Sequence, residues 1–346
     1  MNGAVLNINL NAVKNNFNRL QNFSDKIVET GAVVKANAYG LGVNPIAKHL
    51  FDCKVRTFFV ATVNEAVELR ALIPAEAKIY YLNGYSKNDH QAVNEFNIMP
   101  VLSSIDQIES FKRLSKKSAA LQIDVGMSRL GITTSEISIA KEMCESIDLN
   151  LIIGHLSSAD NKFDKANLSQ LNIFSKLSKY FPNVTKSLAA TGGIILGNKY
   201  HFNLTRPGIG IFGGKPLVKA ENVVTLDLPV LQVKDIKKND GVGYNHTYIA
   251  ERPKKIAIVG SGYADGLFRQ LSNKGILYAG ETPCPILGRI SMDLITVDIT
   301  NIAYKPSTLS VLGPFQTIDD LAAQSSTIGY EILTSLGSRY KRVYHR

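Results

Sequence analysis

The sequence predicts an α/β protein in which an N-terminal (β/α)8 barrel is followed by a C-terminal domain that is mostly β. Three observations lead to this prediction. The chain has 346 residues, enough for a barrel and an appended domain. Its first two thirds alternate short apolar runs with helical patterns, as barrels of the TIM type do. After about Gly214, helix-length patterns give way to short runs between glycine, proline and asparagine turns.

Short apolar runs in the first two thirds are the expected barrel strands. Each run is too short for a helix and is bounded by turn residues, which favours a buried parallel strand. They are Ala32 to Lys35, Phe58 to Ala61, Ile79 to Leu82, Ile98 to Val101, Ala119 to Asp124, Leu151 to His155, Lys186 to Ala189 and Gly208 to Phe212. Because strand order along the chain does not reveal whether a sheet closes, a doubly wound open sheet remains the alternative.

Helix-start signals lie between these runs. Asn44 precedes a proline and is predicted to be an N-cap. Thr62 with Glu65, and Ser104 with Gln107, have the spacing of capping boxes ahead of apolar residues at helical intervals. These signals predict helices after the first, second and fourth expected strands.

The remaining third of the chain predicts a second domain. Its expected strands are Val223 to Val233, Lys255 to Val259, Ile276 to Tyr278, Ile295 to Ile299 and Leu309 to Leu312, and its expected helices are Ile318 to Ala323 and Ile328 to Leu336. Alternation of polar and apolar residues near the N-terminus predicts one more strand of this domain. We therefore expect residues 10–220 to form the barrel, and residues 221–346 with 1–9 to form the β domain.

Composition narrows the class of protein. Hydrophobic residues make up 45% and charged residues 20%, as in ordinary globular proteins. The net charge of +10 comes without a nucleic-acid motif or a basic stripe interleaved with aromatics, so we expect no nucleic-acid partner. No apolar run is long enough for a membrane span, and no secretion signal is evident, so a cytoplasmic location is predicted. Three cysteines and six histidines lack ligand spacing, so no metal site is predicted.

Lys35 is the first candidate for chemistry. It closes an apolar run and is followed at once by small residues and glycines. Loss of hydration at the end of a buried strand lowers the pKa of an amine and makes it a nucleophile, suited to a Schiff base with a carbonyl cofactor. Locally, a lysine at a strand end more often points to solvent. Whether Lys35 is a nucleophile or a solvent-exposed lysine therefore depends on the other motifs.

Further candidates follow the later barrel strands. In a (β/α)8 barrel, the active site lies at the carboxyl ends of the strands, and phosphate binds to the loops after the last two. His155 closes the sixth expected strand and Thr191 follows the seventh. Gly208 and Ile209 lie in the eighth segment, where backbone amides can approach an anion closely.

With these segments in order, the chain resembles the bacterial alanine racemases, which are pyridoxal-phosphate enzymes of fold type III. The matching segments are AVVKANAYGLG, DVGMSRLG, GHLSSAD, RPGIGIFG, VGSGYADGLFR, GRISMD and YEILTSLGSRYKRVY. Together they span both expected domains, which makes the resemblance specific.

The resemblance implies a two-base racemase. Lys35 would hold pyridoxal 5'-phosphate as an aldimine and act as the base on the face used for D-alanine. Tyr263 would be the acid/base on the L-alanine face, supplied by the partner subunit of a homodimer. Racemisation needs two opposed bases, because the proton leaves one face of the α-carbon and returns to the other. The resemblance also implies that the product D-alanine serves peptidoglycan synthesis.

The resemblance assigns further residues to the cofactor and the substrate. His155 would pack on the cofactor ring, and Arg206 would face the pyridine nitrogen and weaken the ring as an electron sink. The phosphate would be held by Tyr39, Thr191, Gly208 and Ile209. The cofactor's phenolic oxygen would lie near Arg129, and the substrate carboxylate would bind the Met292 amide beside Asp293. No metal is implied.

Among the positions that depart from the pattern of the family, two affect expected contacts at the site. Many members have a carbamylated lysine that orients the arginine equivalent to Arg129, and here that position is Gln122. A neutral amide cannot carry the carbamate charge, so Arg129 would be held by hydrogen bonds or by a bound anion such as chloride. We therefore expect activity without added bicarbonate. Ser338 stands where some members have a tyrosine on the phosphate, which puts that contact in doubt.

Two alternative functions fit the sequence less well, and a third stays open. Decarboxylases of the same architecture offer a carboxylate to the pyridine nitrogen, which Arg206 argues against. A non-catalytic cofactor carrier would not need the second domain with Tyr263 and Met292. A serine racemase or one of broader specificity stays open, because one methyl or hydroxyl is worth only ~1–3 kcal/mol of discrimination.

Overall fold

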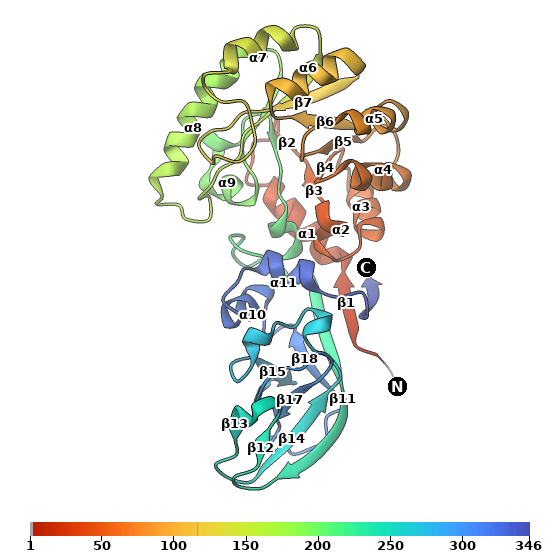
Figure 1. Cartoon of the computed structure of the whole chain (residues 1–346), viewed down its shortest axis with the longest axis vertical. Coiled ribbons are helices and arrows are strands. Elements are labelled where there is room, and N and C mark those ends of the chain that lie inside the picture. The colour runs from red at the N-terminus through yellow and green to blue at the C-terminus, as the bar shows by residue number, and fades with distance from the viewer. Residues whose placement is uncertain (1–2, 116) are drawn as a thin grey trace. The chain divides into compact units, whose positions relative to one another are not determined.

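The computed structural model describes residues 3–115 and 117–346. The chain divides into two compact units, whose elements are labelled in Figure 1. The barrel unit consists of Lys14–Ile211 with Lys215–Ala220. The β unit consists of Met1–Val13, Phe212–Gly214 and Glu221–Arg346.

The barrel unit is a closed ring of parallel strands. The strands β3 to β9 pair in chain order: β3 (Ala32–Val33), β4 (Thr57–Val60), β5 (Lys78–Tyr81), β6 (Met99–Leu102), β7 (Ser118–Gln122), β8 (Asp148–Ile153) and β9 (Thr185–Ser187). The next strand, β10 (Leu204–Thr205), pairs with β2 (Glu29–Thr30), which only Gly31 separates from β3. A bridge between Ala190 and Arg206 joins the end of β9 to β10. The ring excludes a doubly wound open sheet and confirms the barrel prediction.

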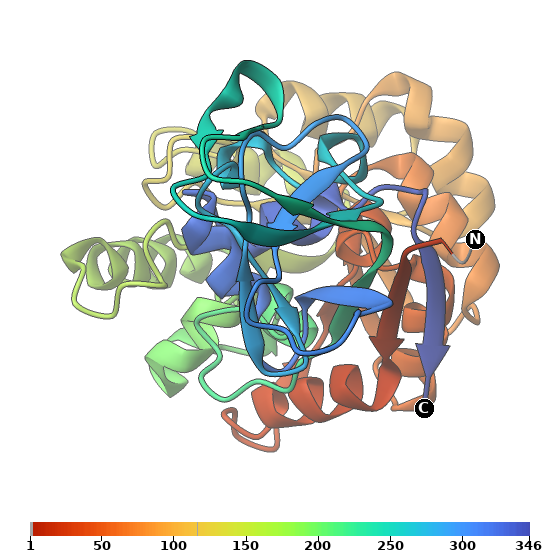
Figure 2. The same ribbon diagram turned by 90° about the horizontal axis from the view of Figure 1, so that it is seen from below.

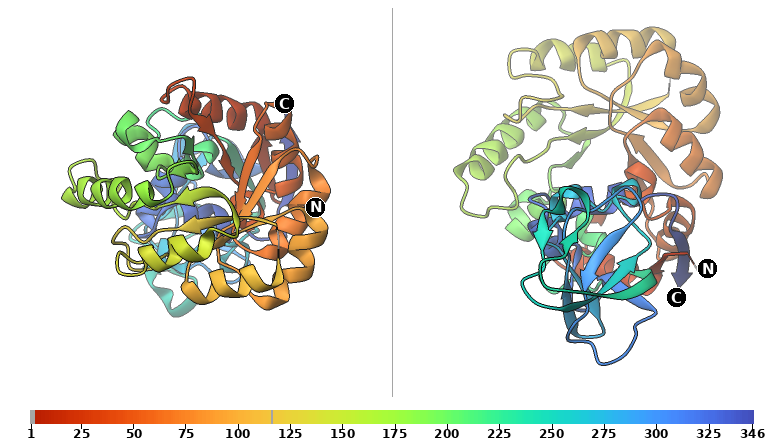
Figure 3. Two further views of the ribbon diagram at one scale, coloured as in Figure 1. Left: turned by 90° about the horizontal axis from the view of Figure 1, so that it is seen from above. Right: turned by 60° about the horizontal axis from the view of Figure 1, so that its bottom comes forward.

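Helices alternate with the strands and lie outside the ring (Figure 3, right). They are α1 (Leu10–Gln21), α3 (Val43–Asp52), α4 (Val63–Leu72), α5 (His90–Phe96), α6 (Ile105–Leu114), α7 (Ile137–Cys144), α8 (Lys165–Leu177) and α9 (Thr191–Leu196). The short element α2 (Lys35–Tyr39) is a left-handed turn and not a regular helix. Thr62 and Glu65 form the predicted capping box of α4. Apolar faces such as Ile108 and Phe111 of α6 are fully buried, which anchors each helix and fixes the carboxyl ends of the strands.

Three local predictions were wrong or half right. Ile209–Phe212 is a 3-10 helix (η4) and not the eighth strand, which lies upstream at β10, because a short apolar run suits either element. Asn44 is not an N-cap: α3 begins at Val43, whose amide donates to Asn37 Oδ1 at 2.7 Å. Ser104 caps α6, but no reciprocal Gln107 bond closes a capping box there, since Gln107 Oε1 accepts from the Ser103 amide.

The β unit contains a mixed sheet that includes the first and last strands of the chain. Figure 2 shows β1 beside β19, and β1 also pairs with β11. The strands are β1 (Val5–Asn9), β11 (Val224–Ile236), β12 (Gly241–Val242), β13 (Tyr248–Ile249), β14 (Lys254–Val259), β15 (Ile276–Ala279), β16 (Thr282–Pro285), β17 (Ile295–Asp298), β18 (Thr308–Leu312) and β19 (Lys341–His345). Two helices, α10 (Ile318–Gln324) and α11 (Gly329–Ser335), follow β18. In the described part of the chain, no helix is long and apolar enough to cross a bilayer.

Candidate functional site

Lys35 begins a tight left-handed turn at the carboxyl end of β3. The next four residues, Ala36 to Tyr39, have φ between 52° and 56° and none of them is glycine. Such a conformation costs roughly 1–2 kcal/mol per residue for an L-amino acid. Residues with this strain persist only where surrounding contacts enforce them, and they concentrate at functional sites.

Glu65 supplies one of those contacts. Its Oε1 accepts a hydrogen bond from the Ala36 amide at 2.6 Å, directly after Lys35. Its Oε2 accepts from the amides of Ala61 at 2.7 Å and Thr62 at 3.1 Å, at the start of α4. One carboxylate therefore ties the Lys35 turn to the neighbouring helix. The sequence revealed Glu65 as a capping residue but gave no signal of its bond to Ala36.

The Lys35 amine has altered acidity. Although part of the side chain reaches solvent, burial by the surrounding barrel residues lowers its pKa, and the positive charge of Arg129 lowers it further. The charge of Glu65 opposes both effects. A lowered pKa enlarges the neutral, nucleophilic fraction of an amine at pH 7. Lys35 thus has the property that its position in the sequence predicted.

Arg206 is buried near the end of β10 and bonds to two neighbouring strands. Its Nη1 donates to Ser187 Oγ on β9, and its Nη2 donates to the Gly154 carbonyl at 2.7 Å. Among the described residues, its Nε has no hydrogen-bond partner. Burial lowers the pKa of the guanidinium to about 9, which leaves it cationic at pH 7. Ser187, which is fully buried, was not singled out from the sequence, and no local signal marked it.

His155 is neutral at physiological pH. Burial is the largest cause of a pKa near 3, followed by the positive charges of Arg206, Arg129 and Lys35. The ring therefore cannot serve as a cation above about pH 4. It presents a flat, uncharged aromatic surface among three cationic groups.

The phosphate candidates lie together around η4. Thr191 Oγ1 accepts hydrogen bonds from the amides of Gly208 at 3.1 Å and Gly210 at 3.3 Å. A Cβ on Gly208 would collide with the Tyr39 hydroxyl, so only glycine allows this approach. Ile209 is 1% exposed, and its amide has no acceptor among the described residues. A buried N–H without a partner beside two hydroxyls suits an anionic ligand.

Arg129 projects from a loop that is fixed at both ends. Asp124 Oδ1 accepts from the amides of Gly126 at 2.9 Å and Met127 at 3.0 Å, and Gln122 Nε2 donates to the Leu130 carbonyl at 2.9 Å. Gln122 therefore holds the backbone of the loop. Among the described residues, no hydrogen bond or ion pair holds the guanidinium of Arg129 itself.

Tyr263 and Met292 belong to the β unit. The two residues are 44% and 52% exposed. The Tyr263 amide donates to the Ser291 carbonyl, and the Ala264 amide donates to the Met292 carbonyl, both at 3.1 Å. The structure thus brings these two predicted residues into adjoining loops of one unit. Ser338 is exposed in the same unit.

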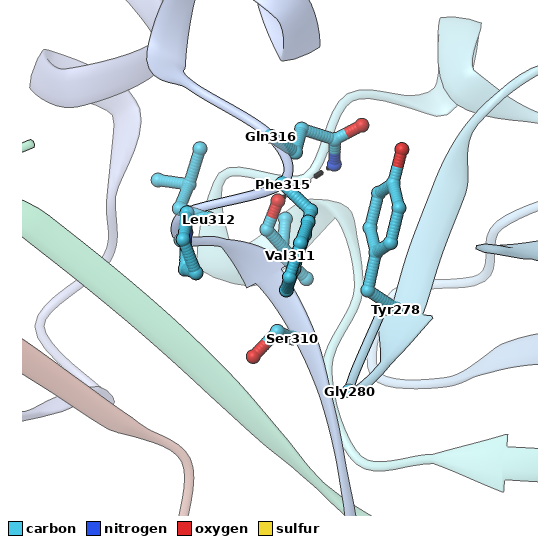
Figure 4. Close-up of a pocket in the computed structure, with 9 residues that line it drawn as sticks. Tyr278, Gly280, Ser310, Val311, Leu312, Phe315 and Gln316 are labelled. Carbon is cyan, nitrogen blue, oxygen red and sulfur yellow. Dashed lines mark hydrogen bonds between the residues drawn. The ribbon is translucent and has the colours of Figure 1, made fainter. Parts of the chain in front are cut away.

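A pocket elsewhere in the β unit lies apart from the predicted site residues. Figure 4 shows the rings of Tyr278 and Phe315, which stack with centroids 6.1 Å apart, beside Gln316. Gln316 Nε2 already donates to the carbonyls of Ile276 and Val311. The lining of this pocket includes none of the predicted site residues. Among the described residues, no group of three or more His, Cys, Asp or Glu is placed to hold a metal ion.

The barrel unit therefore carries the features of an enzyme that binds an anionic carbonyl compound. These features are a lysine amine of lowered pKa, a buried cationic arginine, a neutral histidine and a partnerless backbone amide beside two hydroxyls. All of them belong to the loops at the carboxyl ends of the strands, where (β/α)8 barrels place their active sites.

Comparison with known proteins identifies the class. Residues 8–216 match the family model of the alanine racemase N-terminal domain, and residues 223–344 match that of the C-terminal domain. The chain is 44% identical over 342 residues to an alanine racemase of Cereibacter sphaeroides, covering 99% of this chain and 98% of the relative. It is 41% identical over 351 residues to one of Rickettsia akari, covering 98% of each.

Solved structures agree. The alanine racemase of Bartonella henselae with covalently bound pyridoxal phosphate superposes with a TM-score of 0.95 at 37% identity, covering 100% of both chains. The biosynthetic alanine racemase of Pseudomonas aeruginosa gives 0.94 at 28% identity, again over 100% of both chains. The chain therefore belongs to the alanine racemase family, whose members are pyridoxal-phosphate-dependent isomerases.

Proposed function

We propose that this protein interconverts L-alanine and D-alanine, with Lys35 and Tyr263 as the two bases. The observation that carries the proposal is the Lys35 amine of lowered pKa at the barrel mouth. Arg129, a cause of that lowering, lies in a loop fixed by Asp124 and Gln122. The curated relatives with more than 40% identity are named alanine racemases, which supports alanine as the substrate.

The residues at the barrel mouth fit pyridoxal 5'-phosphate. Lys35 would bind its carbonyl carbon, and Thr191, Tyr39, Gly208 and the partnerless Ile209 amide would hold its phosphate. When bound, the cofactor supplies a carbonyl carbon that bonds to the substrate amine and a ring that withdraws electrons from the α-carbon. The structure of the Bartonella relative, which has pyridoxal phosphate covalently bound, supports the assignment.

Arg206 and His155 would set the electrostatics around the cofactor ring. Because Arg206 keeps its proton at pH 7, its partnerless Nε can donate a hydrogen bond to the pyridine nitrogen but cannot transfer a proton to it. That nitrogen would then stay unprotonated. The electron-withdrawing power of the ring would be limited, which favours return of the proton over side reactions. His155, neutral and flat, would cover the ring without adding charge.

The proton steps belong to two side chains. Lys35 Nζ would remove or return the α-proton on the D-alanine face, and the Tyr263 hydroxyl would do so on the L-alanine face. The Met292 amide would hold the substrate carboxylate beside Asp293. Arg129 would lie near the cofactor's phenolic oxygen and also raise the neutral fraction of Lys35.

The two units would divide this work across a homodimer. Residues 10–220 would bind the cofactor, while residues 221–346 with 1–9 would contribute Tyr263 and Met292 to the site of the partner subunit. Product D-alanine would serve peptidoglycan synthesis. The cytoplasmic location expected from the sequence stays a prediction.

The test is to incubate the purified protein with L-alanine in heavy water and follow both enantiomers and the α-deuterium. We expect D-alanine to form, with deuterium at the α-carbon. Lys35→Ala should abolish racemisation. Absence of both racemisation and exchange in protein that shows cofactor absorbance would contradict the proposal and favour a carrier. A parallel incubation with L-serine tests the broader-specificity alternative, which predicts comparable rates for the two substrates.

A further inference from the structure

One arginine joins the two loops of the β unit that carry Tyr263 and Met292. Arg339 Nε donates to Asp265 Oδ1 at 2.6 Å, and its Nη1 donates to Asp293 Oδ1 at 2.8 Å. Asp265 lies two residues after Tyr263, and Asp293 directly follows Met292. The planar guanidinium therefore spans the two loops from the segment just before β19. A lysine, with a single nitrogen, could not reproduce this fork.

Asp265 fixes the turn that presents Tyr263. The turn is the 3-10 helix η6 (Tyr263–Asp265), and Asp265 is only 5% exposed. Its Oδ2 accepts hydrogen bonds from the Gly262 amide at 3.0 Å and from Ser261 Oγ at 3.3 Å. Ser261 Oγ in turn lies 2.8 Å from the Tyr340 hydroxyl. One carboxylate thus holds the residues before Tyr263 and, through Arg339, the neighbouring loop.

The two loops also touch through their backbones. Besides the amide bonds from Tyr263 and Ala264, Gly262 packs so closely that a Cβ there would collide with the carbonyls of Ser291 and Met292. A displacement of one loop therefore carries the other with it. Arg339, whose side chain is 52% exposed, adds a side-chain link between the same two loops.

We propose that Arg339 is a positioning residue that fixes the Tyr263 hydroxyl and the Met292 amide relative to each other. The inference rests on the proposed function, in which one group binds the substrate carboxylate and the other meets the α-proton. Arg339 is half exposed, and without it Asp265 keeps its bonds from the Gly262 amide and Ser261 Oγ, so the expected effect is on geometry more than on stability. A misplacement of about 1 Å at a reacting group can cost on the order of 100-fold in rate.

The test compares Arg339→Met, which keeps the length of the side chain but removes every donor, with Lys341→Met. Lys341 is an exposed cation two residues along the chain, and its loss should change nothing measured here. For Arg339→Met we expect kcat/KM to fall by about 10–100-fold with little change in thermal midpoint. Asp293→Asn, which breaks only the arm beside Met292, should mainly raise KM. Arg339→Lys should restore only part of the loss.

Two readouts separate positioning from a general structural role. With D-alanine as the starting substrate in heavy water, Arg339→Met should incorporate deuterium into the remaining D-alanine faster, relative to racemisation, than the wild type does. The reason is that proton transfer on the Tyr263 face is impaired while the Lys35 base is untouched. Amide hydrogen exchange should quicken in residues 261–266 and 291–293 of the whole protein. If kcat/KM, the exchange ratio and amide exchange all match those of Lys341→Met, the inference is overturned. If the wild type itself fails to racemise alanine, the proposed function fails, while amide exchange still decides whether Arg339 holds the loops.

Discussion

At the scale of single residues, burial and neighbouring cations set the charge at the barrel mouth. Lys35 and His155 both have lowered pKa values, and burial is the largest cause for each. For Lys35, the added charge of Arg129 favours the neutral amine that a nucleophile requires. For His155, burial and then three neighbouring cations oppose protonation, so that the ring stays neutral over the physiological range. Burial and neighbouring cations thus favour the neutral form of both side chains, a nucleophilic amine in Lys35 and an uncharged ring in His155.

His155 predicts a pH dependence of stability. Its pKa falls from an ordinary 6.5 to about 3 on folding, so between these values the unfolded chain binds a proton that the folded chain does not. Stability from this residue is therefore present above pH 6.5 and is lost as the pH falls towards 3. His155→Gln should lose less free energy of unfolding between pH 7 and pH 4 than the wild type, by roughly 3 kcal/mol. Denaturant titrations of cofactor-free protein at both pH values measure it. Equal losses in the two proteins would show that His155 is not shifted.

At the scale of elements, the left-handed turn after β3 marks the limit of prediction from sequence. Ala32 to Lys35 could be recognised as a buried strand end from its apolar run and following glycines. The turn itself could not, because alanine and tyrosine rarely adopt positive φ. One contact that enforces it comes from Glu65, which is 29 residues from Ala36 along the chain. The conformational preferences of neighbouring residues cannot predict such a contact.

Other features of the fold and the site were predictable only where the residues that determine them are close in the sequence and their pattern fits a single element. The capping box at Thr62 and Glu65 was predictable because both of its partners lie within one helical turn. The segment Ile209–Phe212 was assigned to the wrong element, because its apolar run fits a strand or a helix equally well. The Arg339 link to Asp265 and Asp293 joins segments distant in sequence, and nothing local marked it.

The turn also predicts opposite effects of two substitutions at Ala36. Ala36 is exposed, with a φ of 53°, so a change there alters backbone strain more than packing. Ala36→Gly should leave the free energy of unfolding nearly unchanged, because relieved strain offsets the greater entropy of the unfolded chain. Ala36→Val should lower it by about 1 kcal/mol or more, since a β-branched residue tolerates positive φ poorly. Equilibrium unfolding of the three proteins measures both effects. Equal stability of the valine and glycine variants would contradict the assigned strain.

At the scale of the whole molecule, the proposed catalytic residues are divided between two compact units. The barrel unit holds Lys35, His155 and Arg206, whereas the β unit holds Tyr263 and Met292. Neither unit alone carries both proposed bases. In a dimer of such chains, the two bases of one site could come from the same subunit or from different subunits. We propose that each Lys35 works with the Tyr263 of the partner subunit.

Mixing two inactive variants tests this central claim most directly. Lys35→Ala and Tyr263→Phe should each racemise alanine far more slowly than the wild type, because each lacks one base. After dissociation and reassociation together, a mixed dimer contains one site with both bases intact and one with neither. Random pairing should then restore about a quarter of wild-type activity. If each subunit used its own Tyr263, every site in the mixture would lack one base, and activity no higher than that of the separate variants would contradict the account.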